Sequence, residues 1–286
     1  MGTSNSFGGP KNGTPLIPTW LEPAPPPSMP AQPGDNPNMD EKPIAPSKIP
    51  AIPVPTPNRF TIARTNFSQF AGSNGGNGAG LGRAVSNYVS KSSGGSRQAA
   101  RRMGASRNSG SRLLGFMSNV INNGVEETLQ ELNLGNLIGR PIDEIFLGML
   151  DYICPDGGPI DEGIARDAFV EMIADLSETG ITDFGALTNE QMKTVFELYA
   201  THTIQNRLYN DIANRAIQVP SNPRLARQIQ RQLFDFIRRG VSDALASFQD
   251  SVQEITKQNT NEFVNKVYED AFSILQKLGE LEAEQV

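Results

Sequence analysis

Prolines are concentrated at the start of the chain, and they restrict what that part can fold into. Of the 21 prolines among 286 residues, 16 lie within residues 1–57. Proline fixes φ and has no N–H to donate, so a stretch such as 23–33 favours an extended, solvated backbone over helix or sheet. A region this rich in proline cannot bury enough apolar surface to order itself. Residues 1–57 are therefore predicted to be a disordered tail.

Residues 58–111 differ from the tail in charge. No acidic residue occurs between Glu41 and Glu126, whereas 11 Lys and Arg residues do. Glycine and serine dominate the stretches 74–82 and 92–96, a composition typical of flexible connections. The pattern predicts a basic Gly/Ser-rich linker with one short helix around residues 81–91.

Residues 112–286 carry a helical pattern. Apolar residues recur every three or four positions, as in Leu225, Ile229 and Leu233, and Thr188 with Gln191 forms a capping-box pair at a helix start. Residues 113–286 hold 13 Lys and Arg against 27 Asp and Glu, a net charge of −14. The predicted fold class is all-α: an acidic C-terminal bundle of six to eight helices behind a Pro/Gly-rich tail.

The composition argues against several classes of protein. A single Cys and a single His provide neither a disulfide nor a Cys/His zinc site, and no cofactor is expected. No apolar run is long enough to cross a membrane, and the N-terminus lacks the charged n-region and apolar h-region of a signal peptide, so we expect a cytoplasmic protein without a membrane partner. The Gly-rich run 72–82 lacks the spacing of a nucleotide-binding loop.

Two candidate catalytic groupings are better explained structurally. Cys154 and His202 could form a nucleophile and base, but no orienting group is evident, and a buried Cys with a satisfied His is favoured. The carboxylates between Asp151 and Glu171 resemble helix first turns and a solvated face rather than a metal site. The prediction is therefore a protein with no catalytic or metal-binding residues, that is, not an enzyme.

The basic stretch 59–112 has three interpretations. Cations interleaved with aromatic residues are what a segment needs to follow phosphates and stack on bases. The same charges also fit an acidic partner protein, or the acidic helical domain that follows in this chain. Candidate contacts to nucleic acid or to an acidic partner are Arg97, Arg101 and Arg102.

The tail itself holds two unusual features. Residues 15–21 form an apolar island with the only Trp of the chain, either an anchor for a partner protein or a segment that folds back on its own domain. Gly2 follows the initiator Met1, so removal of Met1 exposes a glycine amine on a long tail. The start also fits the myristoylation pattern, but no second membrane signal accompanies it.

Several segments resemble the QatB family of the bacterial Qat anti-phage defence system. The opening decapeptide Met1-Gly-Thr-Ser-Asn-Ser-Phe-Gly-Gly-Pro10 is the most specific part. Further resembling pieces lie along most of the chain, namely 13–21, Leu81–Ala84, Gly95–Arg97, Ala100–Gly104 and Pro159–Ala168.

The resemblance implies a non-enzymatic component that works with a QueC-like protein, an ATPase and a TatD-like nuclease. It further implies that the QueC-like partner attaches a deazaguanine-type base to Gly2 once Met1 is removed, while the helical domain is a scaffold. Recognition by the partner then falls on Thr3, Ser4, Phe7, Gly8, Gly9, Pro10, Leu16, Trp20 and Leu21. The alternative function is a nucleic-acid-binding adaptor that uses residues 59–112 to recruit the nuclease.

Overall fold

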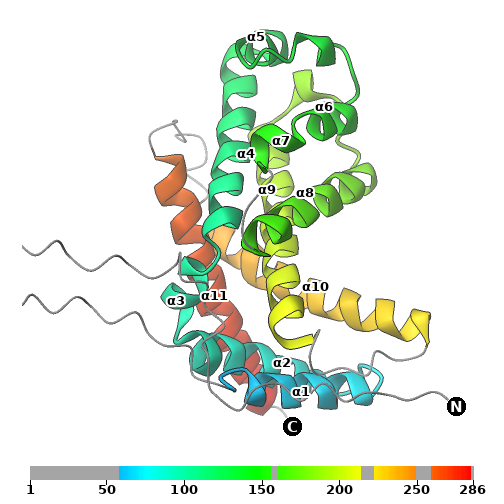
Figure 1. Cartoon of the computed structure of the whole chain (residues 1–286), viewed down its shortest axis with the longest axis vertical. Coiled ribbons are helices and arrows are strands. Elements are labelled where there is room, and N and C mark those ends of the chain that lie inside the picture. Colours follow the sequence, from blue (N-terminus) through cyan, green and yellow to red (C-terminus); the bar gives the residue numbers. More distant parts are fainter. Residues whose placement is uncertain (1–57, 156–159, 214–221, 249–258, 285–286) are drawn as a thin grey trace, which may run out of the picture. The chain divides into compact units, whose positions relative to one another are not determined.

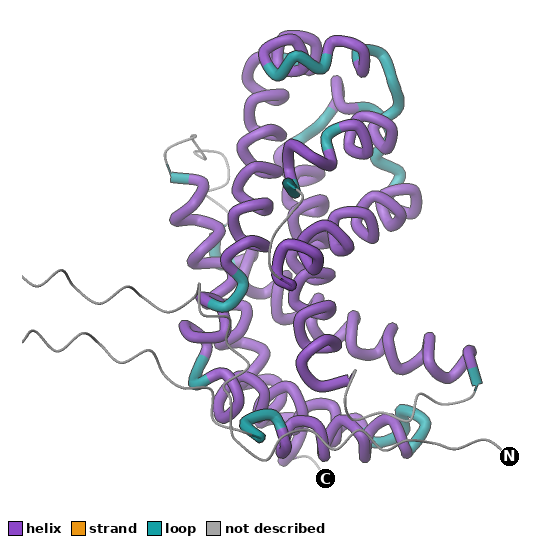
Figure 2. Tube along the Cα trace, in the orientation of Figure 1, coloured by secondary structure: helices purple, strands orange, loops and turns teal. Residues whose placement is uncertain are grey.

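Helices account for the apolar periodicity of the chain from residue 61 onward. The computed structural model describes residues 58–155, 160–213, 222–248 and 259–284, and within these ranges it contains helices, turns and loops but no strand (Figure 2). The predicted all-α class is thereby confirmed for the described residues. The predicted tail, residues 1–57, lies outside them.

The helices follow one another with short connections (Figure 1). In chain order they are α1 (Thr61–Gly72), α2 (Gly78–Asn87), α3 (Ser96–Arg101), α4 (Gly104–Asn123), α5 (Val125–Glu131), α6 (Ile142–Gly148), α7 (Leu150–Ile153), α8 (Ile160–Thr179), α9 (Asn189–Leu208), α10 (Pro223–Ala246) and α11 (Thr260–Glu284). Two π-helical turns, η2 (Tyr88–Ser93) and η5 (Tyr209–Ala213), continue α2 and α9.

Local signals in the sequence set several helix ends. The capping box is present at α9, where Thr188 Oγ1 accepts from the N–H of Gln191 at 3.2 Å and Gln191 Oε1 accepts from the N–H of Thr188 at 2.9 Å. Gly180, with φ of 73°, follows the end of α8, since glycine adopts this left-handed conformation without steric cost. After Pro141 the chain forms two short helices, α6 and α7.

Residues 58–111 differ most from expectation. In place of a linker with one short helix, they form α1, α2, η2, α3 and the start of α4. Phe67, Phe70 and Tyr88 of this region are buried in the same core as the C-terminal helices. Residues 54–286 accordingly form one compact unit, and α4 runs without a break across the expected boundary at residue 112.

Gly82, one of the glycines that gave residues 74–82 the composition of a linker, has a packing role. Gly82 of α2 faces Gly279 of α11, and a Cβ on Gly82 would come within 2.9 Å of the Gly279 carbonyl oxygen. Glycine therefore allows the two backbones to approach closely at this crossing. Composition alone does not distinguish a glycine that loosens a chain from one that fits a helix crossing.

The core is built around α9 and α11. Helix α9 packs against α4, α8 and α10, while α11 packs against α2, α3, α4 and α10 (Figure 1). The largest fully buried side chains are mostly aromatic and come from helices along the whole described chain: Tyr88, Tyr199, Tyr268, Phe67, Phe70, Phe146, Phe169, Phe196, Phe236, Phe272, Met103 and Leu113.

The crossing of α2 and α11 predicts opposite effects for two glycine substitutions. In Gly279→Ala the new Cβ overlaps the carbonyl oxygen of Gly82, so the free energy of unfolding should fall by about 1–3 kcal/mol. In the control Gly163→Ala, in α8, the Cβ meets no atom within 4 Å, and stability should rise by about 0.5–1 kcal/mol. Urea unfolding measures both, and equal losses in the two variants would contradict the close crossing.

Candidate functional site

The residues predicted to be modified or recognised by a partner lie outside the described residues. These are Gly2, Thr3, Ser4, Phe7, Gly8, Gly9, Pro10, Leu16, Trp20 and Leu21. The roles assigned to them therefore stay predictions. The described part of the chain contains the basic segment, the acidic helices and the pockets between them.

Two of the three candidate arginines in the basic segment make contacts within the chain. Arg97 Nε lies 3.1 Å from Glu269 Oε1 on α11, and Arg102 donates from Nη1 to the carbonyl oxygen of Ser92 at 3.3 Å. Burial lowers the pKa of Arg102, and the positive charge of Arg59 lowers it further. Arg101 is exposed. The basic segment thus lies partly on its own domain, one of the interpretations that the sequence left open.

A network of nearly buried charges lies where several helices meet. Arg207 of α9 donates from Nε to Asp211 Oδ2 at 3.1 Å, and its Nη1 lies 3.7 Å from Asp161 Oδ1. The side chains of Arg207, Asp161 and Asp211 are only 15%, 13% and 11% exposed, respectively. Because two carboxylates share one guanidinium, the charges of Asp161 and Asp211 raise the pKa of Arg207 despite the opposing effect of its burial.

The basic segment completes this network. The hydroxyl of Tyr88 donates to Asp211 Oδ2 at 2.9 Å, and burial, together with that carboxylate, raises the pKa of Tyr88. Arg64 of α1 donates from Nε and Nη2 to the carbonyl oxygen of Asp211, at 3.2 and 2.7 Å. Cations are favoured near the carbonyl end of a helix, so Arg64 stabilises the end of η5 as well as joining α1 to it.

Asp161 also holds the start of α4. Its Oδ2 accepts from the backbone N–H of Ala105 at 2.7 Å, and its Oδ1 accepts from the Ser106 hydroxyl at 3.3 Å. The residue before α4, Met103, provides no capping side chain of its own, so a carboxylate from α8 satisfies this first turn. Asp161, in one of the segments that resemble the QatB family, thereby contacts the residues directly after another such segment, 100–104.

The Cys154 thiol is in a structural position. It lies 3.5 Å from the carbonyl oxygen of Ala165 and is buried, and burial raises its pKa to about 11. At neutral pH the group is a thiol rather than a nucleophilic thiolate. This agrees with the interpretation of Cys154 as a buried apolar residue.

His202 is bound between two carboxylates of α8. Its Nε2 lies 2.8 Å from Asp175 Oδ2 and its Nδ1 lies 3.2 Å from Glu171 Oε2. Burial lowers the pKa of His202, but Glu171 and Asp175 outweigh that effect, and the pKa is raised above its ordinary value. The imidazole ring also packs against Phe234 of α10, with 4.8 Å between the ring centroids. His202 therefore links α8, α9 and α10.

The carboxylates between Asp151 and Glu171 contact different partners. Asp151 pairs with Arg166 at 2.8 Å, Asp161 holds α4, and Glu171 contacts His202 and Asn206. In the described ranges no group of three or more His, Cys, Asp or Glu side chains is arranged to hold a metal ion. Asp156 lies outside those ranges.

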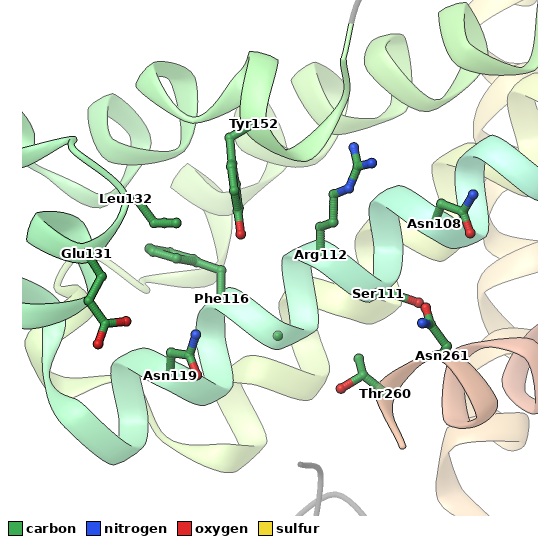
Figure 3. A pocket seen from close by; sticks show the side chains of 11 residues that line it. Asn108, Ser111, Arg112, Phe116, Asn119, Glu131, Leu132, Tyr152, Thr260 and Asn261 are labelled. Carbon is green, nitrogen blue, oxygen red and sulfur yellow. The ribbon is translucent and has the colours of Figure 1, made fainter. Parts of the chain in front are cut away.

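The pocket in Figure 3 is a candidate recess for a ligand or a partner peptide. It has a volume of about 530 Å³ and lies among α4, α5, α7 and the start of α11. Tyr152 reaches from α7 toward α4, where Phe116 and Arg112 lie (Figure 3). The pocket offers hydrogen-bonding groups and two aromatic rings but no activated nucleophile, because the nearby Cys154 holds its proton. Its lining residues are Asn108, Ser111, Arg112, Gly115, Phe116, Asn119, Glu131, Leu132, Tyr152, Thr260 and Asn261.

The Arg207 network and this pocket were not predicted from the sequence. The spacing of Arg207 and Asp211, four residues apart, was visible, but it is also the spacing of an ordinary exposed ion pair on a helix. The pocket is lined by residues that are more than a hundred positions apart in the sequence, so no local sequence pattern predicts it.

The Arg207 network predicts a large loss of stability on removal of its cation. Arg207→Met leaves Asp161 and Asp211 poorly solvated without their shared partner, and the free energy of unfolding should fall by about 3 kcal/mol. The control Arg140→Met breaks an exposed pair with Glu144 and should cost less than about 1 kcal/mol. Denaturant unfolding at pH 7 compares them, and similar costs would contradict a central role for Arg207.

His202 predicts a pH dependence of stability. Its raised pKa means that stabilisation by protonated His202 is complete below the unfolded value of about 6.5 and is lost as pH rises through the folded value. The lowered pKa of Glu171 acts oppositely, with stabilisation lost as pH falls below about 4.5. NMR titration of the only histidine should give a midpoint above 6.5, and His202→Gln should remove the loss on the alkaline side. A midpoint below 6.5 would contradict the arrangement.

Comparisons with known proteins were made for the whole chain. No curated protein and no solved structure matches it. None of the helices in the described ranges has the length and apolar character needed to span a bilayer. The family described as Qat anti-phage system associated protein QatB matches residues 94–275, more than half of the chain and nearly all of the helices from α3 to α11. The chain belongs to the QatB family of the Qat anti-phage defence system.

Proposed function

We propose that this protein is a non-enzymatic component of the Qat system and the substrate of a QueC-like partner. In this proposal the partner attaches a deazaguanine-type base to Gly2 after Met1 is removed, and the helical unit is the scaffold that binds the system's other proteins. Membership of a defence system with several components supports the existence of partners. The observation that carries the modification is the chain's start, where glycine follows Met1 within a decapeptide that resembles this family.

The chemistry suits an N-terminal glycine. The neutral α-amine attacks the activated acyl carbon of the base, a C–N amide bond forms, the bond to the activating phosphate breaks, and one proton is released. The pKa of an α-amino group is about 7.7–8.0, so a useful fraction is neutral near physiological pH. Glycine has no side chain to obstruct entry into the partner's active site.

The number of residues between Gly2 and the described unit is compatible with this role. Residues 3–57 separate Gly2 from Asn58, and a chain of that length can span at most about 180 Å when fully extended. Gly2 can therefore reach an active site on a partner bound at any face of the helical unit. Exposed apolar side chains that could support such binding include Leu147 at 58% and Tyr152 at 45% exposure, the latter at the mouth of the Figure 3 pocket.

The alternative function, a nucleic-acid adaptor using residues 59–112, receives less support. Arg64, Arg97, Arg102 and Arg107 all contact acceptors within the described unit. Their charges are therefore partly engaged in folding. Arg101 is the one predicted contact of this segment for which the fold shows no such use.

Intact-mass measurement after co-expression with the QueC-like partner tests the modification. The expected result is an added mass on the N-terminal peptide that contains Gly2, absent when the partner is left out. Gly2→Ala should reduce the modified fraction strongly, because a methyl group is added beside the attacking amine. The matched control Gly13→Ala, outside the predicted recognition residues, should be modified like the wild type.

Two results would overturn the proposal in whole or in part. If cells resist phage while Gly2 carries no added mass, modification is not part of the defence function. If the added mass maps to another residue, the acceptor is wrong even though the protein is a substrate.

A further inference from the structure

A row of unpaired arginines lies on the first half of α10. Arg224, Arg227 and Arg231 are spaced three and four residues apart, so they share one face of the helix, and all three are exposed. Within the described ranges none of them makes an ion pair or a hydrogen bond through its side chain. The two later arginines of the helix behave differently, since Arg238 pairs with Glu197 at 2.6 Å and Arg239 with Glu282 at 2.8 Å.

This placement is unfavourable for the isolated fold. The start of a helix carries the positive end of its dipole, and α10 has no acidic residue in its first turn. Like charges three and four residues apart also repel one another. The preceding residues 214–221 contain no Asp or Glu that could compensate. Asp235, four residues after Arg231, offsets the charge at that end of the row only, so Arg224 and Arg227 cost stability without a partner among the described residues.

The chemistry of the row fits phosphates. All five cations of α10 are arginine, whose planar guanidinium donates two parallel hydrogen bonds to a phosphate. A helix rises about 1.5 Å per residue, so the row from Arg224 to Arg231 extends about 10 Å along a line. A linear row of forked donors matches a chain of regularly spaced phosphates better than a single small anion.

The face around the row lacks the features of a protein interface. Its other exposed side chains are Gln228, Gln230 and Asp235, all of them polar, whereas Phe236 is buried and Phe234 packs inward against His202. Protein partners require an apolar or aromatic centre, and single-stranded nucleic acid requires aromatic rings for stacking. A duplex backbone requires neither, because cations and amides suffice to contact its phosphates.

We propose that Arg224, Arg227 and Arg231 form a binding site for the phosphate backbone of double-stranded nucleic acid. The site reads no base sequence, since the row offers phosphate contacts alone. It is distinct from the basic segment 59–112, whose arginines are largely engaged within the fold. In Figure 1 the N-terminal half of α10, in yellow, extends past α9.

Salt-dependent binding of the full-length protein to a short fluorescent DNA duplex tests the site. Three phosphate contacts predict a slope of log affinity against log salt of about −2.7, so affinity should fall about 40-fold between 50 and 200 mM KCl. The triple variant Arg224→Gln, Arg227→Gln, Arg231→Gln should lose this slope and bind at least tenfold more weakly at 50 mM. The triple lysine variant, which keeps the charges, should keep the slope.

Two controls separate binding from folding and from the other basic region. The glutamine variant should unfold at the same temperature as the wild type or higher, because it removes cations from a helix start. The variant Arg97→Gln, Arg101→Gln should bind DNA like the wild type, and Gly2→Ala should also leave binding unchanged.

Four results would overturn the proposal. They are no binding by the wild type at 50 mM KCl, unchanged binding by the glutamine variant, loss of binding in the Arg97 and Arg101 variant alone, and competition by poly-glutamate as strong as that by unlabelled duplex. The last result would identify an acidic protein as the partner of α10.

Discussion

The Arg207 guanidinium and its two carboxylates are the constraint on which much of the fold depends. Burying Asp161 and Asp211 is costly unless both are paired, and each has only a few neighbours that can donate to it. Besides Arg207, Asp161 accepts hydrogen bonds from the first turn of α4, and Asp211 accepts one from Tyr88 of η2. The network therefore fixes α4, α8, α9 and the N-terminal helices relative to one another, so that none of them can shift alone.

The same interaction explains why the opposite charges of the two halves belong to one fold. Composition alone predicts a linker for the basic segment, because this composition is typical of flexible chains. Its cations nevertheless contact the acidic half at Glu269 through Arg97 and at η5 through Arg64. Ion pairs and hydrogen bonds within the chain thus engage many of the cations that had suggested an external ligand. Among the described residues, a row of three arginines without such a contact lies on α10, inside the acidic half.

Local patterns were enough to predict the helical class, the capping box at Thr188 and the structural position of Cys154, because each depends on residues near in sequence. The folding of residues 58–111 was not predictable in this way. Gly82 has its role only beside Gly279, and His202 acquires its raised pKa only beside two carboxylates of another helix. Glycine-rich and charge-rich segments are ambiguous, since the same residues serve a solvated chain and a close helix crossing.

The network also holds α1, the first helix after residues 1–57. Residues 1–57 join the described unit just before α1, and α1 is fixed by Arg64 to the carbonyl of Asp211 and by Phe67 and Phe70 in the core. The family match begins at residue 94, after α1 and α2, yet both helices are held by residues within or next to the matched region. The start of α1, which follows residues 1–57 in the chain, is therefore held by the folded unit. In the proposed function, a partner bound to the helices is tethered to Gly2 through residues 3–57, which raises the local concentration of Gly2 at the partner's active site.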